Sequence, residues 1–134
     1  MISRLLYISD ARISFDQQVA MIVERSRIWN ARVGITGTLV RTDRHFVQFI
    51  EGGVESVVDM ARKLACDERH TNMRIIDAGI CDQRQFSNWS LAYSGPDDFI
   101  DRRLVDLVTV NTGQDSDVIA HHLMSSLIGM ASYG

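Results

Sequence analysis

The chain has 134 residues, of which 46% are hydrophobic and 23% are charged, and its formal net charge is −3. This composition is typical of one globular domain that can bury a hydrophobic core. Its 14 lysine and arginine residues are scattered among 17 acidic ones, so no basic stripe indicates a nucleic-acid partner.

The first part of the chain predicts a strand followed by a helix. Arg4–Ser9 alternates branched and aromatic residues over two faces, which favours a strand. Ser14–Gln17 has the spacing of a capping box, the side-chain arrangement that satisfies free amides at a helix start. We expect that helix to run to about Asn30, because Gly34 just beyond it is a stop signal.

A hairpin and a second helix follow. Ile35–Arg41 and His45–Glu51 predict two strands joined by a turn at 42–44, after which a glycine pair interrupts the chain. A helix over about Glu55–Cys66 is predicted because apolar residues recur at helical spacing, namely Val54, Val57, Val58, Ala61, Leu64 and Ala65.

Two more strands complete the predicted domain. A polar loop at Asp67–Met73 precedes a strand at Arg74–Asp82, and a fifth strand is expected at Trp89–Tyr93. The order βαββαβ with an added strand predicts an α+β, ferredoxin-like sandwich. In this fold, two helices cover one face of a mostly antiparallel sheet.

The pattern changes after residue 95 to two amphipathic helices, over Asp97–Val110 and Ser116–Met130. We therefore divide the chain into a domain at 1–95 and a helical extension at 96–134. The extension has a face too apolar to stay exposed, formed by Ile119, Leu123, Leu127 and Met130. We expect this extension to pack on the sheet or to form a surface for a partner or for a homo-oligomer.

Neither the cysteines nor the apolar segments indicate secretion or a membrane. Cys66 and Cys81 have no metal-ligand spacing and form no C-x-x-C pattern, which fits a reducing cytoplasm. The first residues, MISRLLYIS, turn polar too soon for a signal peptide, and no apolar run reaches membrane-spanning length. We expect a cytoplasmic protein that binds no metal.

Gln48 is an unusual residue for the middle of its predicted strand. It shares a strand face with Phe46 and Ile50, and a buried amide without a partner costs about 1–3 kcal/mol. That face is therefore either exposed to water or carries a hydrogen-bond partner for the amide. Tyr7 is also placed in mid-strand, where a core tyrosine whose hydroxyl reaches solvent or a carbonyl is the ordinary interpretation.

The predicted helices also become polar where an apolar stripe should continue. On the first helix, the stripe through Ile22 leads to Ser26 and Asn30, and a helix end near solvent explains that feature by itself. The segment Asp67–His70, taken alone, is typical of a solvated loop. Trp89, taken alone, is most simply a packing residue of the core or the sheet edge.

Considered together, these residues predict a binding slot. Four polar side chains converge between the helices if the helices cover the face that carries both strand residues: Tyr7, Ser26, Asn30 and Gln48. Ile22 and Leu64 would then form apolar walls, so the slot suits a flat heteroaromatic ring with carbonyl and imide edges. Charged groups for a carbonyl, ribityl or phosphate would stand at its mouth, from Lys63, Arg69 and His70.

Five motifs follow one another over about residues 1–93: RLLYIS, S-R-x-x-N-x-x-x-G-I-T-G, H-F-V-Q-F-I-E-G, D-E-R-H and F-S-N-W-S. In this order they resemble the BLUF family of blue-light sensors that use FAD. The G-I-T-G and Q-x-x-E-G elements are the specific ones. The resemblance implies a photoreceptor rather than an enzyme, with FAD bound noncovalently between the two helices.

The resemblance also implies a role for each matching residue. Tyr7 corresponds to the tyrosine that transfers an electron and a proton towards the excited flavin, and Gln48 to the glutamine that then rearranges. Asn30 would hold the pyrimidine edge, and Trp89 matches a tryptophan linked to signalling. The remaining matches are Ser26 beside the tyrosine–glutamine network, Lys63 near a flavin carbonyl, and Asp67, Arg69 and His70 along the ribityl and phosphate groups.

The chain departs from the family pattern at two positions. Leu91 stands where a methionine is common, and a leucine offers no sulfur for a hydrogen bond from the glutamine. Trp29 replaces a residue that is often polar or histidine, and its indole either stacks on the ring or shields the pocket. A stand-alone sensor of this kind would signal through a downstream protein or through its own oligomer.

Two other functions stay open on the residues. A ferredoxin-like hydrolase of the acylphosphatase type would need an arginine and an asparagine over a phosphate-binding loop. The glycine pair at 52–53 is followed by Val-Glu-Ser, which makes an unpromising cradle for an anion. The other alternative is a flavin protein that has lost photoactivity and only mediates assembly, and Tyr7 with Gln48 argues against it.

Overall fold

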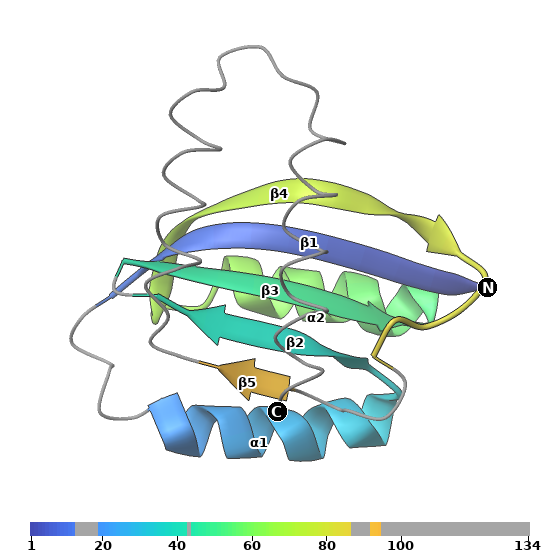
Figure 1. Ribbon diagram of the computed structural model, residues 1–134, viewed down its shortest axis with the longest axis horizontal. Helices are drawn as coiled ribbons and strands as arrows, with labels where there is room; N and C mark the ends of the chain where they lie inside the picture. Colours follow the sequence, from blue (N-terminus) through green and yellow to red (C-terminus); the bar gives the residue numbers. More distant parts are fainter. Residues whose placement is uncertain (13–18, 43, 87–91, 95–134) are drawn as a thin grey trace, which may run out of the picture.

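A computed structural model describes residues 1–12, 19–42, 44–86 and 92–94 of the chain (Figure 1). These residues form one five-stranded sheet and two helices. The strands are β1 (Ile2–Ala11), β2 (Thr36–Arg41), β3 (His45–Gly52), β4 (His70–Cys81) and β5 (Ala92–Ser94), and the helices are α1 (Val19–Val33) and α2 (Val54–Ala65).

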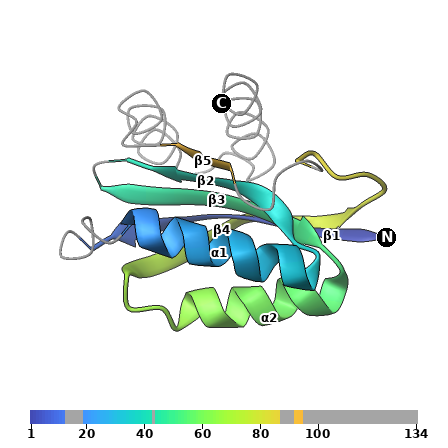
Figure 2. The same cartoon turned by 90° about the horizontal axis from the view of Figure 1, so that it is seen from below.

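The sheet has the strand order β4-β1-β3-β2-β5. Strand β1 runs antiparallel to β3 and β4, β2 runs antiparallel to β3, and β5 is parallel to β2. The crossovers β1–α1–β2 and β3–α2–β4 place both helices on the same face of the sheet (Figure 2). The predicted ferredoxin-like βαββαβ fold with an added fifth strand is therefore confirmed.

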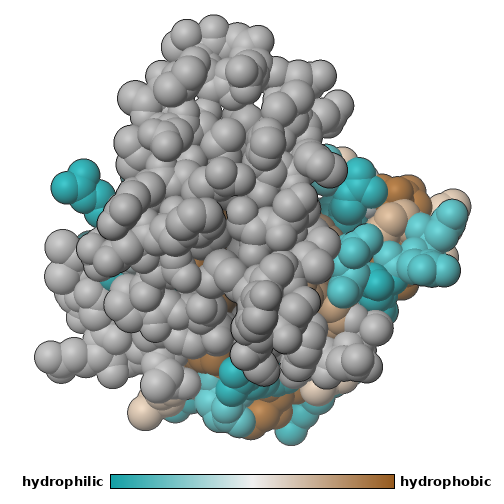
Figure 3. Space-filling model, in the orientation of Figure 1, coloured by the Kyte–Doolittle hydropathy of each residue, from teal (hydrophilic) through white to brown (hydrophobic). Residues whose placement is uncertain are grey.

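Strand β4 begins earlier than predicted. The polar loop expected at Asp67–Met73 was a wrong prediction for its second half, because His70 and Thr71 already pair with the end of β1. The pairing of β1 with β4 contains register shifts, and Asn72 has a φ of 55°. Because these irregularities interrupt the strand, its first residues do not show the regular alternation from which a strand is predicted. Polar residues are tolerated because β4 lies at the sheet edge. At the right of Figure 3, where described residues are visible, hydrophilic and hydrophobic residues lie side by side on the surface.

Several predicted features lie outside the described residues. They are the capping box at Ser14–Gln17, most of the strand at Trp89–Tyr93, the two helices beyond residue 95, and the side chains of Trp89 and Leu91. The described part of the fifth strand, β5, pairs with β2 through Ala92, Tyr93 and Ser94.

The sheet buries apolar side chains on both faces. On the face towards the helices, Leu5, Ile35 and Ile50 pack with Val57 of α2. On the opposite face, the side chains are at most 1% exposed at Leu6, Ile8, Val40, Val47 and Phe49. Strand alternation therefore sorts neighbouring residues into two cores, and Gln48 belongs to the face that the helices cover.

The G-I-T-G motif has a structural reason at each glycine. Gly34 has a φ of 73° and ends α1, and the Ile35 amide donates to the Asn30 carbonyl oxygen over 2.9 Å, which is the Schellman pattern of a helix end. At Gly37, an added Cβ would collide with the Phe49 carbonyl oxygen of the neighbouring strand. The motif thus fixes where α1 ends and how closely β2 approaches β3.

A buried carboxylate fastens the segment at 84–86 to the end of the β2–β3 hairpin. The Glu51 side chain is fully buried and accepts hydrogen bonds from the Phe86 amide (2.6 Å), the Gln85 amide (2.8 Å) and the Thr36 hydroxyl (3.1 Å). The Arg84 guanidinium donates to the Glu51 backbone carbonyl and to the Thr36 hydroxyl. These bonds anchor the chain that leads towards β5.

We predict that Glu51→Ala destabilises the fold, because it leaves the buried amide of Phe86 and the partly buried amide of Gln85 without acceptors. The free energy of unfolding, measured by urea denaturation, should fall by about 2–4 kcal/mol. Glu55→Ala is the matched control, since Glu55 is exposed in the first turn of α2 and should change stability by less than about 0.5 kcal/mol. Equal losses for the two variants would contradict the anchoring role of Glu51.

Candidate functional site

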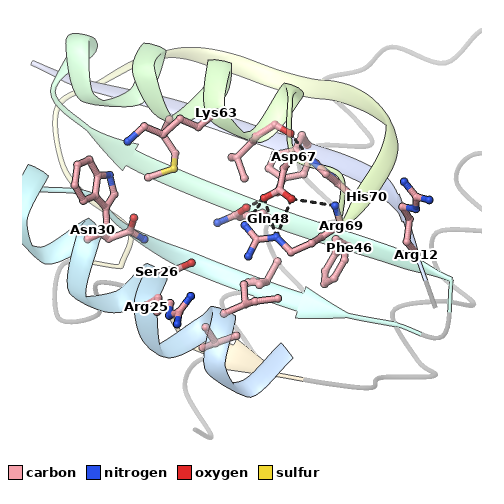
Figure 4. A pocket seen from close by; sticks show the side chains of 17 residues that line it. Arg12, Arg25, Ser26, Asn30, Phe46, Gln48, Lys63, Asp67, Arg69 and His70 are labelled. Carbon is pink, nitrogen blue, oxygen red and sulfur yellow. Dashed lines mark hydrogen bonds and ion pairs between the residues drawn. The ribbon is translucent and has the colours of Figure 1, made fainter. Parts of the chain in front are cut away.

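A cavity of about 420 Å³ lies between the two helices and the sheet (Figure 4). This volume is within the usual range of small-molecule sites, about 300–1,000 Å³. All eleven residues predicted to surround a ligand line it: Tyr7, Ile22, Ser26, Trp29, Asn30, Gln48, Lys63, Leu64, Asp67, Arg69 and His70. The structure thus brings the predicted set together, while the binding roles of these residues stay predictions.

Tyr7 and Gln48 are joined by a buried hydrogen bond at the base of the cavity. They are register partners in the β1–β3 pair, and the Tyr7 hydroxyl donates to Gln48 Oε1. Their side chains are only 2% and 6% exposed. The amide oxygen is therefore satisfied inside the protein, and the amide nitrogen remains as the group that can donate to a ligand.

Burial keeps the Tyr7 phenol neutral. Desolvation raises the pKa of Tyr7 far above its usual range, the negative charge of Asp67 raises it further, and the positive charge of Arg69 opposes both. A neutral phenol keeps its proton at physiological pH. Tyr7 can therefore serve as the hydrogen-bond donor to Gln48.

His70 fastens the end of α2 to β1 beside Tyr7. Its Nδ1 lies 2.6 Å from Ser9 Oγ, and its Nε2 donates to the Leu64 carbonyl oxygen, which can only accept. The centres of the His70 and Tyr7 rings are 5.8 Å apart and tilted by 57°. Both ring nitrogens are therefore used within the protein.

Asp67 and Arg69 form a folded ion pair in the loop after α2. Asp67 Oδ1 accepts hydrogen bonds from the Arg69 side-chain Nε (2.7 Å) and backbone amide (3.0 Å), and Oδ2 pairs with Nη2. Burial opposes the ionisation of Asp67, but the hydrogen bonds and charge of Arg69 outweigh it, so the pKa of Asp67 lies below its usual value. The pair holds the Arg69 guanidinium at the cavity before any ligand arrives.

One stripe of α1 supplies the opposite wall. Ile22, Ser26 and Asn30 recur every fourth residue and all line the cavity. Asn30 is only 1% exposed, so the interpretation of this helix end as solvent-facing was wrong. The helix end is covered because Gly34 turns the chain directly back into the buried strand β2.

Six residues of the cavity were missed by the sequence analysis: Arg12, Val23, Arg25, Leu39, Phe46 and Met60. Strand alternation could have found two of them. Phe46 shares a strand face with Gln48, and Leu39 is the register partner of Gln48 on β2. Arg12 and Arg25 carry no such signal, because each looks like an ordinary exposed arginine.

The comparison with protein families identifies the chain. Residues 2–92 match the family model described as sensors of blue light using FAD, or BLUF. The chain belongs to the BLUF family. This membership confirms the resemblance of the motifs and does not favour the acylphosphatase-type alternative.

Curated relatives of this BLUF chain are named as photoactivated enzymes. The photoactivated adenylate cyclase subunit beta of Euglena gracilis is 28% identical over 97 residues, which cover 70% of this chain and 11% of that protein. A subunit beta-like protein FB of the same organism is 30% identical over 92 residues, which cover 67% of this chain and 11% of that protein. The chain therefore spans about a tenth of the length of these relatives.

Solved structures of short BLUF proteins match almost the whole chain. BlrB in its dark state has a TM-score of 0.75 and 27% identity, over 99% of this chain and 97% of that chain. BlsA in its photo-activated state has a TM-score of 0.78 and 26% identity, over 96% of this chain and 95% of that chain. The fold of this chain is that of a blue-light sensor domain.

The cavity of this BLUF domain fits a flavin ring. Its buried carboxamides, Asn30 and Gln48, match a ring edge that carries carbonyl and imide groups. Ile22 and Leu64 supply aliphatic walls. Within the described ranges, no cluster of His, Cys, Asp and Glu could hold a metal ion, and no helix is long and apolar enough to span a membrane.

We predict that the raised pKa of Tyr7 makes the fold sensitive to alkali. In the unfolded chain the Tyr7 phenol ionises near pH 10, whereas in the folded protein it stays neutral. The contribution of this phenol to the free energy of unfolding is therefore fully present below about pH 10 and is lost as the pH rises further. The free energy of unfolding should therefore fall more steeply in wild type than in Tyr7→Phe from about pH 10 upwards. Parallel pH profiles by urea denaturation would show that Tyr7 titrates normally.

Proposed function

We propose that this chain is a photoreceptor module that binds FAD noncovalently in the cavity between α1 and α2. In this proposal the chain is not an enzyme, and it passes the light signal to a partner protein or through its own oligomer. The observation that carries the proposal is the buried hydrogen bond from Tyr7 to the Gln48 side-chain oxygen. It leaves the Gln48 side-chain nitrogen to donate to a ligand in a cavity with a polar edge.

In the proposed complex, each wall of the cavity has a distinct task. Asn30 holds the pyrimidine edge of the flavin, and Ile22 and Leu64 contact its faces. Arginines on three separate segments line the cavity and would meet the ribityl and phosphate groups: Arg12, Arg25 and Arg69. This positive charge favours FAD, which carries two phosphates, over FMN, which carries one.

Tyr7 and Gln48 would act together as the switch. When bound, a flavin supplies absorption of blue light and, once excited, a strong attraction for an electron. Tyr7 is neutral and hydrogen-bonded, so it can release an electron and its proton together and later regain both. During this cycle Gln48 would change its rotamer or tautomer and keep a new set of hydrogen bonds.

The proposed output route runs through the part of the chain beyond β4. Glu51, three residues after Gln48 on the same strand, fastens the segment at 84–86 that leads towards Trp89. We propose that Trp89 responds to the rearranged Gln48 and that the extension at 96–134 presents the signal. Leu91 offers no sulfur acceptor, so the switch would work without a glutamine–methionine exchange.

The assignment of Asn30 predicts weaker flavin binding in Asn30→Ala. A buried hydrogen bond would be lost and its flavin partner left unpaired, at a cost of about 1–3 kcal/mol, or roughly one to two decades in affinity. Affinity for FAD is measured by fluorescence titration of the flavin-free protein. Glu24→Ala, an exposed change on the same helix, is the control and should bind as wild type does. Wild-type affinity in Asn30→Ala would contradict the assignment.

The proposed switch predicts that Tyr7→Phe separates flavin binding from the light response. The variant keeps the ring beside His70 and should retain FAD, but the small red shift of the flavin absorption band under blue light should disappear. Gln48→Leu should also abolish this shift, because no carboxamide remains to reorganise. Tyr133→Phe, the same change outside the family match at 2–92, should preserve the shift. A wild-type red shift in Tyr7→Phe would overturn the mechanism.

A further inference from the structure

Trp29 and Lys63 connect the two helices beside the cavity. The Lys63 Nζ of α2 lies 3.8 Å from the centre of the Trp29 indole ring of α1. Both residues line the main cavity and also a second hollow of about 250 Å³ between the helices. The pair therefore stands where one hollow ends and the other begins.

The cavity end at which this pair stands is the one near Asn30. Figure 4 shows Lys63 reaching from α2 towards the side of the cavity that carries Asn30, away from Asp67 and Arg69. Trp29 directly precedes the proposed flavin-binding asparagine, Asn30, on α1. The contact between Lys63 and Trp29 therefore bridges the two helices at the Asn30 end of the cavity.

The chemistry of the contact suits a closure that can open. An ammonium group is attracted to the face of an indole, and the four-carbon stem of lysine lets it leave and return. The Trp29 side chain is 43% exposed and Lys63 is exposed, so water competes for both partners. Such a contact is modest in strength and therefore controls a rate more readily than it locks a structure.

We propose that Trp29 and Lys63 form a clasp that closes the Asn30 end of the cavity and slows the escape of the bound flavin. The inference rests on the proposed function, because it assigns the clasp to the same flavin site. It differs from a direct role of Lys63 at a flavin carbonyl, since the clasp requires the two residues to act as one unit.

The dissociation rate of FAD in the dark tests this proposal. Trp29→Leu keeps apolar bulk without an aromatic face, and Lys63→Met keeps the stem without the charge. Each should raise the dissociation rate roughly threefold to fivefold, and the double variant should match the single ones rather than multiply their effects. Arg62→Met is the matched control, because Arg62 is the neighbouring cation on α2 and lines only the second hollow. Its rate should equal that of wild type.

A flavin-free readout separates this inference from the proposed function. Urea denaturation of the flavin-free variants should show the same non-additivity, because the contact exists without a ligand. Additive effects on unfolding, or dissociation rates that multiply in the double variant, would overturn the clasp. If the effects on unfolding are non-additive but the wild-type chain never retains flavin, the contact between Trp29 and Lys63 exists. Its role in flavin retention would then be overturned, and the proposed function would be contradicted by the missing flavin and not by the unfolding data.

Discussion

The hydrogen bond from Tyr7 to Gln48 is the interaction on which the site depends, and it depends in turn on the register of β1 against β3. The two residues are direct register partners, and both point to the face that the helices cover. A slip of β3 by one residue would turn Gln48 to the opposite face, beside Leu6, Ile8 and Val40 of the neighbouring strands. The carboxamide would then be buried in an apolar core without the phenol, which is a costly arrangement.

Three further contacts position the elements around this pair. Gly34 ends α1 so that Asn30 stays buried opposite Gln48. His70 bonds to Ser9 and to the Leu64 carbonyl, which joins the end of α2 to the strand that carries Tyr7. Glu51 anchors the chain after β4 to the β2–β3 hairpin. Each of these contacts joins two elements, so the cavity is defined by the packing of the whole sheet-and-helix sandwich.

The electrostatics of the cavity divide it into a neutral base and a charged mouth. Burial raises the pKa of Tyr7, so the base contains uncharged donors and acceptors. At the mouth, Asp67 holds the Arg69 guanidinium by several hydrogen bonds. This division suits a ligand with an uncharged planar end and an anionic end, which is the form of a flavin nucleotide.

The sequence by itself determined the ferredoxin-like order and the polar strand and helix residues of the cavity. It could do so because strand alternation and helical spacing are local rules, and Tyr7, Gln48 and Ile22 each obey them. Trp29 and Asp67 were predicted only from the resemblance of the motifs to a family, because neither stands at a position that these rules single out. The tertiary structure decided the start of β4 at His70, the burial of Asn30, the places of Arg12 and Arg25, and the contact of Trp29 with Lys63. These features arise where segments distant in the chain meet, and no pattern within one segment records which partner its side chains will find.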